Sequence, residues 1–242
     1  ETVVVAHPDK MGAVVASFDD TDALKVPGVI AVREIPQGVA VYAKTTGAAL
    51  KGREALQVTW DDSKAETRSS AQIYADFSRA AAEGGRAAEE VGDAMAGIDG
   101  AAEAEFHFPY LAHAALEPLD AVLEVTDGKA ELWMGSQFPS LDKPTLAATL
   151  GIDPSDVQIN VMFAGGSFGR RAQPTAHVAA EVAEIAKAAG GNGSWKLLWT
   201  REDDMIGGYY RPLTVHKMKG GLDADGNIVG WHDVVVNQSI MA

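Results

Sequence analysis

The stretch DVQINVMFAGGSFGRRAQPTAHVAAEVAEIAKAAGG, residues 156–191, predicts a strand, a glycine-rich turn and a helix in direct succession. The first eight residues read as a strand. The helix is expected from Thr175 onward, because Val178, Val182 and Ile185 recur at intervals of four and three residues and so form one apolar face. This succession of elements is typical of an α/β fold.

The turn itself combines Gly165, Gly166 and Gly169 with Ser167 and a single large ring, Phe168. Glycine permits positive φ and a close backbone approach, and the first N–H groups of a helix lack partners within it. Such a turn could bind an anion or an oxo ligand. It is not a nucleotide-binding P-loop, because the lysine and the Ser/Thr after the last glycine are missing, and it does not match the dinucleotide fingerprint. A tight turn that needs small residues remains the alternative, although such a turn gains little from Phe168.

Composition narrows the function classes. The chain has 242 residues, 47% of them hydrophobic, and its 20 Lys+Arg against 34 Asp+Glu give a formal net charge of -14. Without a concentrated basic face, a nucleic-acid partner is not expected. The absence of cysteine excludes disulfides, thiolate metal ligands and iron–sulfur clusters within this chain. No apolar run approaches the ~20 residues that span a bilayer.

Along the chain, short strands and helices alternate. The segment 45–56 is expected to be a helix with Thr46 as its cap, and Asp19–Asp22 are candidate caps for a short helix. The polar stretch after residue 62 is a predicted linker, followed by a helix over residues 71–84. Asp127-Gly128 and Asp225-Gly226 predict the turns of two β-hairpins. Strands are expected within the segments 2–8, 28–36, 38–43, 57–61, 102–111, 120–135, 156–163, 194–200 and 213–238, and a further short helix over 145–151.

Two acidic clusters have plain structural explanations. DADGN (223–227) resembles the start of a calcium loop, but Ile228 stands where that loop needs glycine, so a hairpin turn explains it better. REDDM (201–205) is expected to be a solvated loop rather than a metal site.

Two histidines are candidate ligands. His113 and Glu117 are four residues apart, but Pro118 argues against a stable helix that would present them to zinc. His177, in the first turn of the helix after the glycine-rich turn, is expected to be a capping or packed histidine. Neither histidine is therefore a predicted metal ligand.

The order of the motifs is more specific than any one of them. YLAHAALEPLDA (110–121), ELWMGSQFPS (131–140), AGGSFGRR (164–171) and REDDMIGGYYRP (201–212) together resemble the molybdenum-binding large subunit of the xanthine dehydrogenase/aldehyde oxidase family, isoquinoline 1-oxidoreductase-like branch. The first sixty residues resemble that family's α/β-hammerhead domain. The resemblance implies a mixed α/β fold with a hammerhead-like domain over 1–62, a linker over 63–75, and the N-terminal part of a molybdenum-cofactor-binding domain over 76–242.

The resemblance also implies site residues. Gln137 matches the family glutamine that hydrogen-bonds an oxygen ligand of molybdenum. Gly165, Gly166, Ser167, Phe168 and Gly169 match the family's Gly-Gly-Gly-Phe-Gly loop, whose backbone amides approach the metal's oxo group and the pyranopterin. Phe168 would then line the substrate side. Arg211 falls where relatives carry an arginine that faces the substrate pocket, although a surface or phosphate-pairing role fits it equally well.

Two positions depart from the family pattern. Ser167 replaces the central glycine of the loop. Ala172 stands where xanthine-type members carry a glutamate that contacts substrate, which argues against purine specificity. No catalytic residue or metal ligand is assigned, because the family's general-base glutamate is expected beyond the end of this chain.

For the whole enzyme, the resemblance implies hydroxylation of an aldehyde or N-heterocycle with water as the oxygen donor. It implies molybdenum-molybdopterin cytosine dinucleotide as cofactor, a [2Fe–2S] small subunit as partner, and a periplasmic location, with the cytoplasm as the alternative. The chain alone is expected to be inactive. Two other hypotheses stay open: a cofactor-free fragment or subunit-interaction module, and an unrelated nucleotide-binding α/β module.

Overall fold

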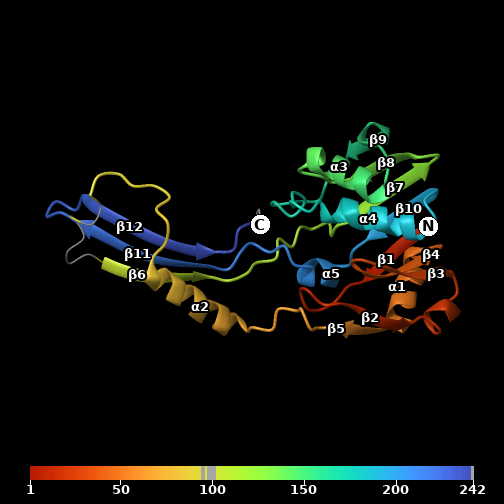
Figure 1. The fold of residues 1–242 in the computed structure, drawn as a ribbon, viewed down its shortest axis with the longest axis horizontal. Helices are drawn as coiled ribbons and strands as arrows, with labels where there is room; N and C mark the ends of the chain where they lie inside the picture. The colour runs from red at the N-terminus through yellow and green to blue at the C-terminus, as the bar shows by residue number, and fades with distance from the viewer. Residues whose placement is uncertain (94–95, 97–101, 241–242) are drawn as a thin grey trace. The chain divides into compact units, whose positions relative to one another are not determined.

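The computed structural model describes residues 1–93, 96 and 102–240 (Figure 1). The chain forms two compact units. Unit 1 comprises Glu1–Glu66 and Ala112–Tyr209, and unit 2 comprises Thr67–Leu111 and Tyr210–Ala242. Both units combine strands with helices, which confirms the predicted mixed α/β class.

Unit 1 is built on a seven-stranded mixed sheet with the order β3-β4-β1-β10-β7-β8-β9. The pairs β1/β10 and β8/β9 are parallel and the other four are antiparallel. The sheet therefore joins strands from both sides of the predicted 63–75 linker, while the domain boundaries implied by the resemblance stay predictions. Its strands are β1 (Thr2–Ala6), β3 (Val29–Ile35), β4 (Gly38–Ala43), β7 (Asp120–Thr126), β8 (Lys129–Met134), β9 (Val157–Val161) and β10 (Gly193–Leu198).

Helices cover both faces of this sheet near β1 (Figure 1). Side chains alternate between the faces of a strand. Val3 and Val5 accordingly join the main core with α3 (Pro139–Leu150) and α4 (His177–Ala188), whereas Val4 joins a smaller core with α1 (Thr46–Ala55). This burial on both sides explains why β1 is a continuous apolar run rather than an alternating one.

The predicted apolar face of α4 is confirmed, because Val178, Val182 and Ile185 are all buried in the main core. Two short 3₁₀ helices, η1 (Ala23–Lys25) and η2 (Pro154–Asp156), and a two-stranded pair of β2 (Val14–Asp19) with β5 (Gln57–Asp61) complete the periphery of unit 1. The strand β2 is absent from the sequence-based expectations, because only the cap residues at its end give a recognisable signal.

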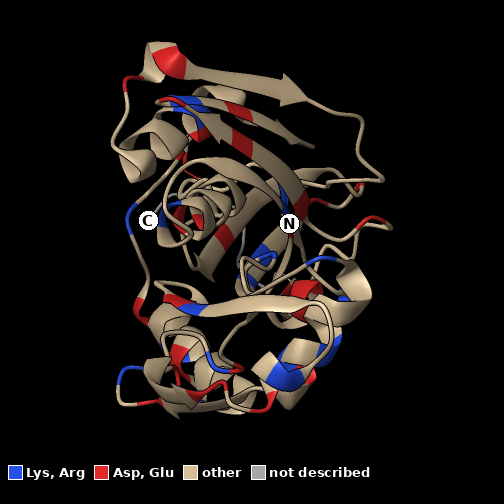
Figure 2. Cartoon of the chain, turned by 90° about the vertical axis from the view of Figure 1, so that its right-hand side faces the viewer, with Lys and Arg blue, Asp and Glu red and all other residues tan. Residues whose placement is uncertain are grey.

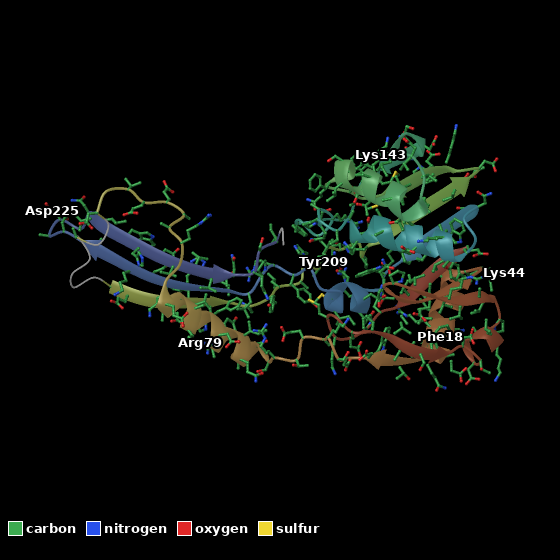
Figure 3. The ribbon with its side chains drawn as sticks, in the orientation of Figure 1. Phe18, Lys44, Arg79, Lys143, Tyr209 and Asp225 are labelled. Atoms are coloured by element: carbon green, nitrogen blue, oxygen red, sulfur yellow. The ribbon has the colours of Figure 1, made fainter. Side chains whose placement is uncertain are left out.

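Unit 2 is a three-stranded antiparallel sheet of order β12-β11-β6, with α2 packed against it. The elements are α2 (Ser70–Glu83), β6 (Ala102–Phe108), β11 (Thr214–Leu222) and β12 (Ile228–Asn237). Asp225 lies at the tip of the predicted second hairpin (Figure 3). The other predicted hairpin, between β7 and β8 in unit 1, is also confirmed.

Three local expectations are corrected. The cap of α1 is Thr45 rather than Thr46, because the Thr45 side chain accepts a hydrogen bond from Ala48 N. The short helix expected over 145–151 begins earlier, at Pro139. The predicted solvated loop at 201–205 is instead the helix α5 (Arg201–Ile206), which starts with a capping box between Thr200 and Asp203.

The charged residues are dispersed: Lys and Arg lie among Asp and Glu in Figure 2 rather than in one basic stripe. Among the described residues, no helix is long and apolar enough to cross a bilayer.

Candidate functional site

The glycine-rich loop follows β9 and leads toward α4, as the sequence predicts. Gly166 and Gly169 have φ values of 104° and 97°, and Phe168 has a φ of 54°. A bulky residue in this left-handed region is strained, and such strain clusters at functional sites. Ser167 does not share the positive φ, so its replacement of the family's central glycine brings no backbone penalty.

Phe168 and Gly166 form one packing unit. A Cβ placed on Gly166 would lie 3.1 Å from Cε2 of the Phe168 ring, so the ring covers the space that a side chain at 166 would need. The ring itself remains 75% exposed. The φ of Gly166 therefore favours glycine at this position, and a side chain there would also have to displace the Phe168 ring by a few tenths of an ångström.

Gln137 lies against the end of this loop. Its Oε1 accepts hydrogen bonds from Gly169 N (3.1 Å) and Arg171 N (3.3 Å), and its own backbone N donates to Arg171 O (3.1 Å). Because backbone N–H groups can only donate, they orient the amide with its oxygen toward the loop. The NH₂ group is then the end that Gln137 can offer as a donor to a ligand. The structure thus brings together Gln137 and the loop, and their binding role stays a prediction.

Glu117 holds the beginning of the loop. Its Oε2 accepts from Gly165 N at 2.9 Å, and its Oε1 accepts from Arg171 Nη2 at 2.7 Å. The Arg171 side chain is only 1% exposed, and it also donates to the carbonyl oxygens of Gly135, Glu117 and Pro118. A buried guanidinium needs such a counter-charge and such acceptors. Both carboxylate oxygens of Glu117 therefore bind groups of the loop region. The sequence suggested Glu117 only as a possible zinc ligand together with His113 and did not indicate this role.

Three successive N–H groups of the loop, those of Gly166, Ser167 and Phe168, have no hydrogen-bond acceptor among the described residues. The neighbouring amides are occupied, since Gly165 donates to Glu117 and Gly169 donates to Gln137. A run of free donors on a backbone bare of side chains at 165 and 166 suits an anionic or oxo-bearing ligand. These residues fit the molybdopterin cofactor that the family resemblance implies. They would hold its phosphate or oxo oxygens through N–H donors rather than through metal ligands.

Directly after the loop, the buried side chain of Arg170 packs against a cluster of rings. Its guanidinium lies 5.5 Å from the ring centre of Trp199 and 5.3 Å from that of Tyr209, and its Nη1 is 2.7 Å from His177 Nε2. His177 stacks on Tyr209 with ring centres 4.5 Å apart. Tyr209 lies just beyond α5 (Figure 3). The prediction that His177 is a packed residue is confirmed.

Arg170 also determines the tautomer and the protonation of His177. A guanidinium can only donate, so His177 Nε2 accepts and the ring proton lies on Nδ1. Burial first and the nearby Arg170 cation second hold the pKa of His177 well below its usual value. Burial and Arg170 also lower the pKa of His113. Both rings are therefore neutral near pH 7, which keeps this side of the loop free of added positive charge.

A second buried group lies behind Trp199. Glu181 is 1% exposed and accepts from His7 Nε2 (2.5 Å) and from Trp199 Nε1 (2.8 Å). Burial lowers the pKa of His7, but the charge and hydrogen bond of Glu181 outweigh burial, so the net shift of the pKa is upward. This pair fixes the indole on which Arg170 rests.

The two buried carboxylates of α5 have cationic partners. Asp203 accepts from Arg53 Nη1 at 2.7 Å, and Asp204 accepts from Arg201 Nη1 at 2.7 Å. Asp204 also lies 3.9 Å from Arg170 Nε. The prediction of a solvated loop at 201–205 is wrong because arginines from other segments, Arg53 above all, offset the cost of burying these carboxylates. Within the described part of the chain, no group of three or more His, Cys, Asp or Glu side chains could hold a metal ion.

Arg211, the remaining predicted site residue, belongs to unit 2. It pairs with Leu111 in an isolated β-bridge, and its Nη2 donates to Pro109 O at 3.1 Å. Its role at a substrate pocket stays a prediction.

Large apolar side chains are exposed on the segments that meet at the loop. Leu116 is 91% exposed and Phe163 fully so, in addition to Phe168. Leu116 directly precedes Glu117, and Phe163 lies two residues before Gly165, which donates a hydrogen bond to Glu117. Adjacent exposed apolar residues around free polar donors are typical of a surface that binds a ligand or another chain.

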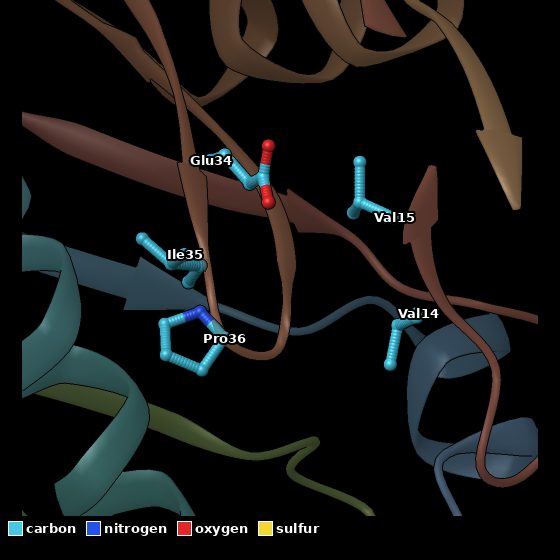
Figure 4. A pocket seen from close by; sticks show the side chains of 5 residues that line it. All are labelled: Val14, Val15, Glu34, Ile35 and Pro36. Carbon is cyan, nitrogen blue, oxygen red and sulfur yellow. The ribbon is translucent and has the colours of Figure 1, made fainter. Parts of the chain in front are cut away.

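A cavity of about 460 Å³ in unit 1 lies elsewhere, between β2 and the end of β3 (Figure 4). It is lined by Val14, Val15, Glu34, Ile35 and Pro36. One carboxylate among four apolar residues offers no convergent set of polar groups. The free donors of the loop, rather than this cavity, mark the candidate site.

Comparisons with known proteins show the family and the fold of the chain. Residues 74–240 match the family model of the molybdopterin cofactor-binding domain. Among curated proteins, the chain is 31% identical to the beta subunit of isoquinoline 1-oxidoreductase from Brevundimonas diminuta, over 93% of this chain and 30% of that protein. It is 27% identical to a subunit of nicotinate dehydrogenase from Pseudomonas putida, over 92% of this chain and 19% of that protein. The chain thus spans about a third or less of the length of these relatives.

Solved structures show the same fold. Aldehyde oxidoreductase from Desulfovibrio gigas superposes with a TM-score of 0.74 at 19% identity, covering 98% of this chain and 31% of that one. Quinoline 2-oxidoreductase from Pseudomonas putida 86 gives a TM-score of 0.70 at 18% identity, covering 96% and 35% of the two chains.

Proposed function

Because this chain belongs to the molybdopterin-binding subunits of the xanthine dehydrogenase/aldehyde oxidase family, we propose that it supplies the glycine-loop side of the cofactor site in an isoquinoline 1-oxidoreductase-like molybdenum hydroxylase. The substrate class is an aldehyde or N-heterocycle, and water is the oxygen donor. The observation that carries the proposal is the run of three free N–H donors at Gly166, Ser167 and Phe168, beside the oriented amide of Gln137.

The residues of this chain bind and orient. When bound, the molybdenum cofactor supplies the oxygen-transfer and redox chemistry. The three free N–H groups donate to its oxygens, and the NH₂ group of Gln137 adds a fourth donor. Donors that are held in place before the reaction stabilise negative charge without reorganising, which is the largest electrostatic contribution in many enzymes.

Phe168 provides an apolar wall beside these donors. Its ring is held over Gly166 and is exposed on its other side, so a flat aromatic or aldehyde substrate could pack against it. Arg211 of unit 2 is the proposed polar contact to the substrate. Neither residue transfers a proton in this proposal, and the 242 residues alone are proposed to be inactive.

The proposed cofactor form is molybdopterin cytosine dinucleotide, and the proposed partner is a [2Fe–2S] small subunit. Both curated relatives are named as single subunits of their enzymes, which supports a multi-subunit enzyme. A partner with its own cluster would also provide the electron path that a chain without cysteine cannot provide. A periplasmic location belongs to the same proposal.

Metal analysis of the whole large subunit tests the proposal. The subunit is produced in a host that makes the cofactor, and molybdenum is measured by mass spectrometry together with the nucleotide released by hydrolysis. We expect molybdenum close to one atom per subunit, cytosine nucleotide, and loss of both on replacing Gln137 and Gly166 with bulkier residues. A folded whole subunit without molybdenum would contradict the proposal and favour an interaction module.

A further inference from the structure

We infer that Glu117 is a positioning residue that clamps both ends of the glycine-rich loop and thereby leaves its middle amides free for the cofactor. This inference deepens the proposed function and rests on it. One carboxylate oxygen accepts from Gly165 N at 2.9 Å, and the other accepts from Arg171 Nη2 at 2.7 Å. The backbone N of Glu117 also donates to Gly165 O at 3.3 Å. Glu117 thus contacts the first residue of the loop twice and binds the side chain that follows its end.

The clamp requires a carboxylate of this length. Gly165 N and Arg171 Nη2 are both donors, so each needs an accepting oxygen of Glu117, and only an ionised carboxyl group has two such oxygens. A glutamine would place its NH₂ group against either Gly165 N–H or the Arg171 guanidinium. The nearest other carboxylate to Arg171 is Asp120, whose Oδ1 lies 3.8 Å from Nη1, which is beyond hydrogen-bond distance.

The clamp also explains Gly165. A Cβ at this position would lie 2.7 Å from Glu117 Cβ and 3.1 Å from Glu117 N. Gly165 does not have a positive φ, so neither the backbone angle nor the cofactor is needed to account for this glycine. Its absent side chain makes room for Glu117. Gly165 is therefore assigned to the clamp, and Gly166 to Phe168 and the ligand.

Because the loop is fastened at 165 by Glu117 and at 169 and 171 by Gln137, the amides between them are the ones that remain available. Releasing one end would let the loop amides find other acceptors or water. The donors would then no longer be preorganised for the cofactor, even in a correctly folded unit.

Two variants of the whole large subunit test this inference, together with one control. Glu117→Gln removes one acceptor and the charge, and Gly165→Ala displaces Glu117 while keeping every charge. The control is Glu54→Gln, which makes the same charge change at an exposed position of α1 in unit 1. Hydrogen exchange of peptides covering residues 162–171 is measured in the cofactor-free protein. Molybdenum per folded subunit and the Mo(V) electron paramagnetic resonance spectrum are measured after loading.

We expect exchange of the Gly165, Gly169 and Arg171 amides to accelerate at least tenfold in both variants and to stay unchanged in the control. Molybdenum per folded subunit should fall at least tenfold, and any residual Mo(V) spectrum should be altered. Unchanged exchange in both variants would overturn the clamp. Faster exchange with wild-type molybdenum content and spectrum would overturn its role toward the cofactor. A wild-type subunit without molybdenum would instead refute the proposed function, and the exchange comparison would still decide whether Glu117 holds the loop.

Discussion

Replacing Glu181 with glutamine should destabilise unit 1 in a way that depends on pH. Glu181 is 1% exposed, and its two oxygens accept from His7 Nε2 and Trp199 Nε1. The indole N–H can only donate, so the glutamine oxygen must face Trp199 and the NH₂ group must face His7. His7 then has to present a lone pair on Nε2 and move its proton to Nδ1, which is buried without a hydrogen-bond partner among the described residues.

The magnitude follows from these bonds. At a pH where His7 is neutral, the variant exchanges one hydrogen bond for another and leaves one buried N–H unsatisfied, which costs about 1–3 kcal/mol. At a pH where His7 is protonated in the wild type, Nδ1 carries an unsatisfied proton in both proteins, so that cost cancels. The variant instead loses a buried charge-assisted hydrogen bond, worth about 1.5–3 kcal/mol, and must also deprotonate His7 or bury an uncompensated imidazolium. Glu181→Leu, which leaves two buried donors unsatisfied, should cost more than Glu181→Gln at every pH.

The sign of the pH dependence comes from the raised pKa of His7 in the folded state. A group with a raised folded pKa contributes stability that is fully present below its unfolded pKa, about 6.5, and that is lost as the pH rises through the folded pKa. In Glu181→Gln the charge and hydrogen-bond contributions of Glu181 are gone, and burial, the largest single cause, then lowers the pKa of His7 against the smaller upward effect of Asp203. The difference in unfolding free energy between wild type and variant should therefore be larger near pH ~5.5 than near pH ~9.

Urea unfolding at several pH values, followed by tryptophan fluorescence, measures this difference. Glu184→Gln is the control, because Glu184 lies on the same helix and is 21% exposed with a 3.7 Å ion pair to Lys187. We expect the control to change stability by less than about 0.5 kcal/mol at any pH. If Glu181→Gln showed the same loss at the acidic and the alkaline pH, the charged His7–Glu181 pair would not be the source of the raised pKa.

Two further substitutions test the packing of unit 1. Gly166→Ala should cost about 1–3 kcal/mol, because the alanine would adopt a φ of 104° with its Cβ 3.1 Å from the Phe168 ring, and denaturant unfolding with unchanged stability would contradict this. Tyr42→Phe should cost about 0.5–1.5 kcal/mol by removing the buried 2.8 Å hydrogen bond to Ile185 O. The cost should be at the low end, since Ala189 N also donates to that carbonyl, and a shift in the thermal unfolding midpoint checks it.

Local signals in the sequence predicted local structure well. Asp127-Gly128 and Asp225-Gly226 each mark a confirmed hairpin. Asp127-Gly128 is a two-residue turn in which both residues have a positive φ, which few residue types adopt. Asp225-Gly226 lies in a longer connection, residues 223–227, where only Gly226 has a positive φ. The spacing of Val178, Val182 and Ile185 likewise places the apolar face of α4 in the core. In each case the determining contacts lie within one element or between its nearest neighbours.

Long-range pairing was beyond the sequence patterns. The parallel pair β1/β10 joins Thr2 to Lys196, 194 residues later in the chain, and the periodicity of a strand does not show which other strand it pairs with. The acidic run at 201–205 was misjudged for a similar reason, because Arg53 is the distant residue that allows Asp203 to be buried. A charged residue can be placed inside or outside only when its partner is known.

The loop shows how much of a binding site depends on such distant partners. Of the seven N–H groups from Gly165 to Arg171, one donates to Glu117, two to Gln137 and one to Ser167 O. The other three, at 166–168, have no acceptor in the part of the chain that the structure describes. The two side-chain acceptors come from segments 48 and 32 residues earlier in the chain. Without them, the flexible glycine loop would offer competing donors along its whole length and no fixed arrangement. The glycines therefore make the approach of a ligand sterically possible, whereas Glu117 and Gln137 decide which donors meet it.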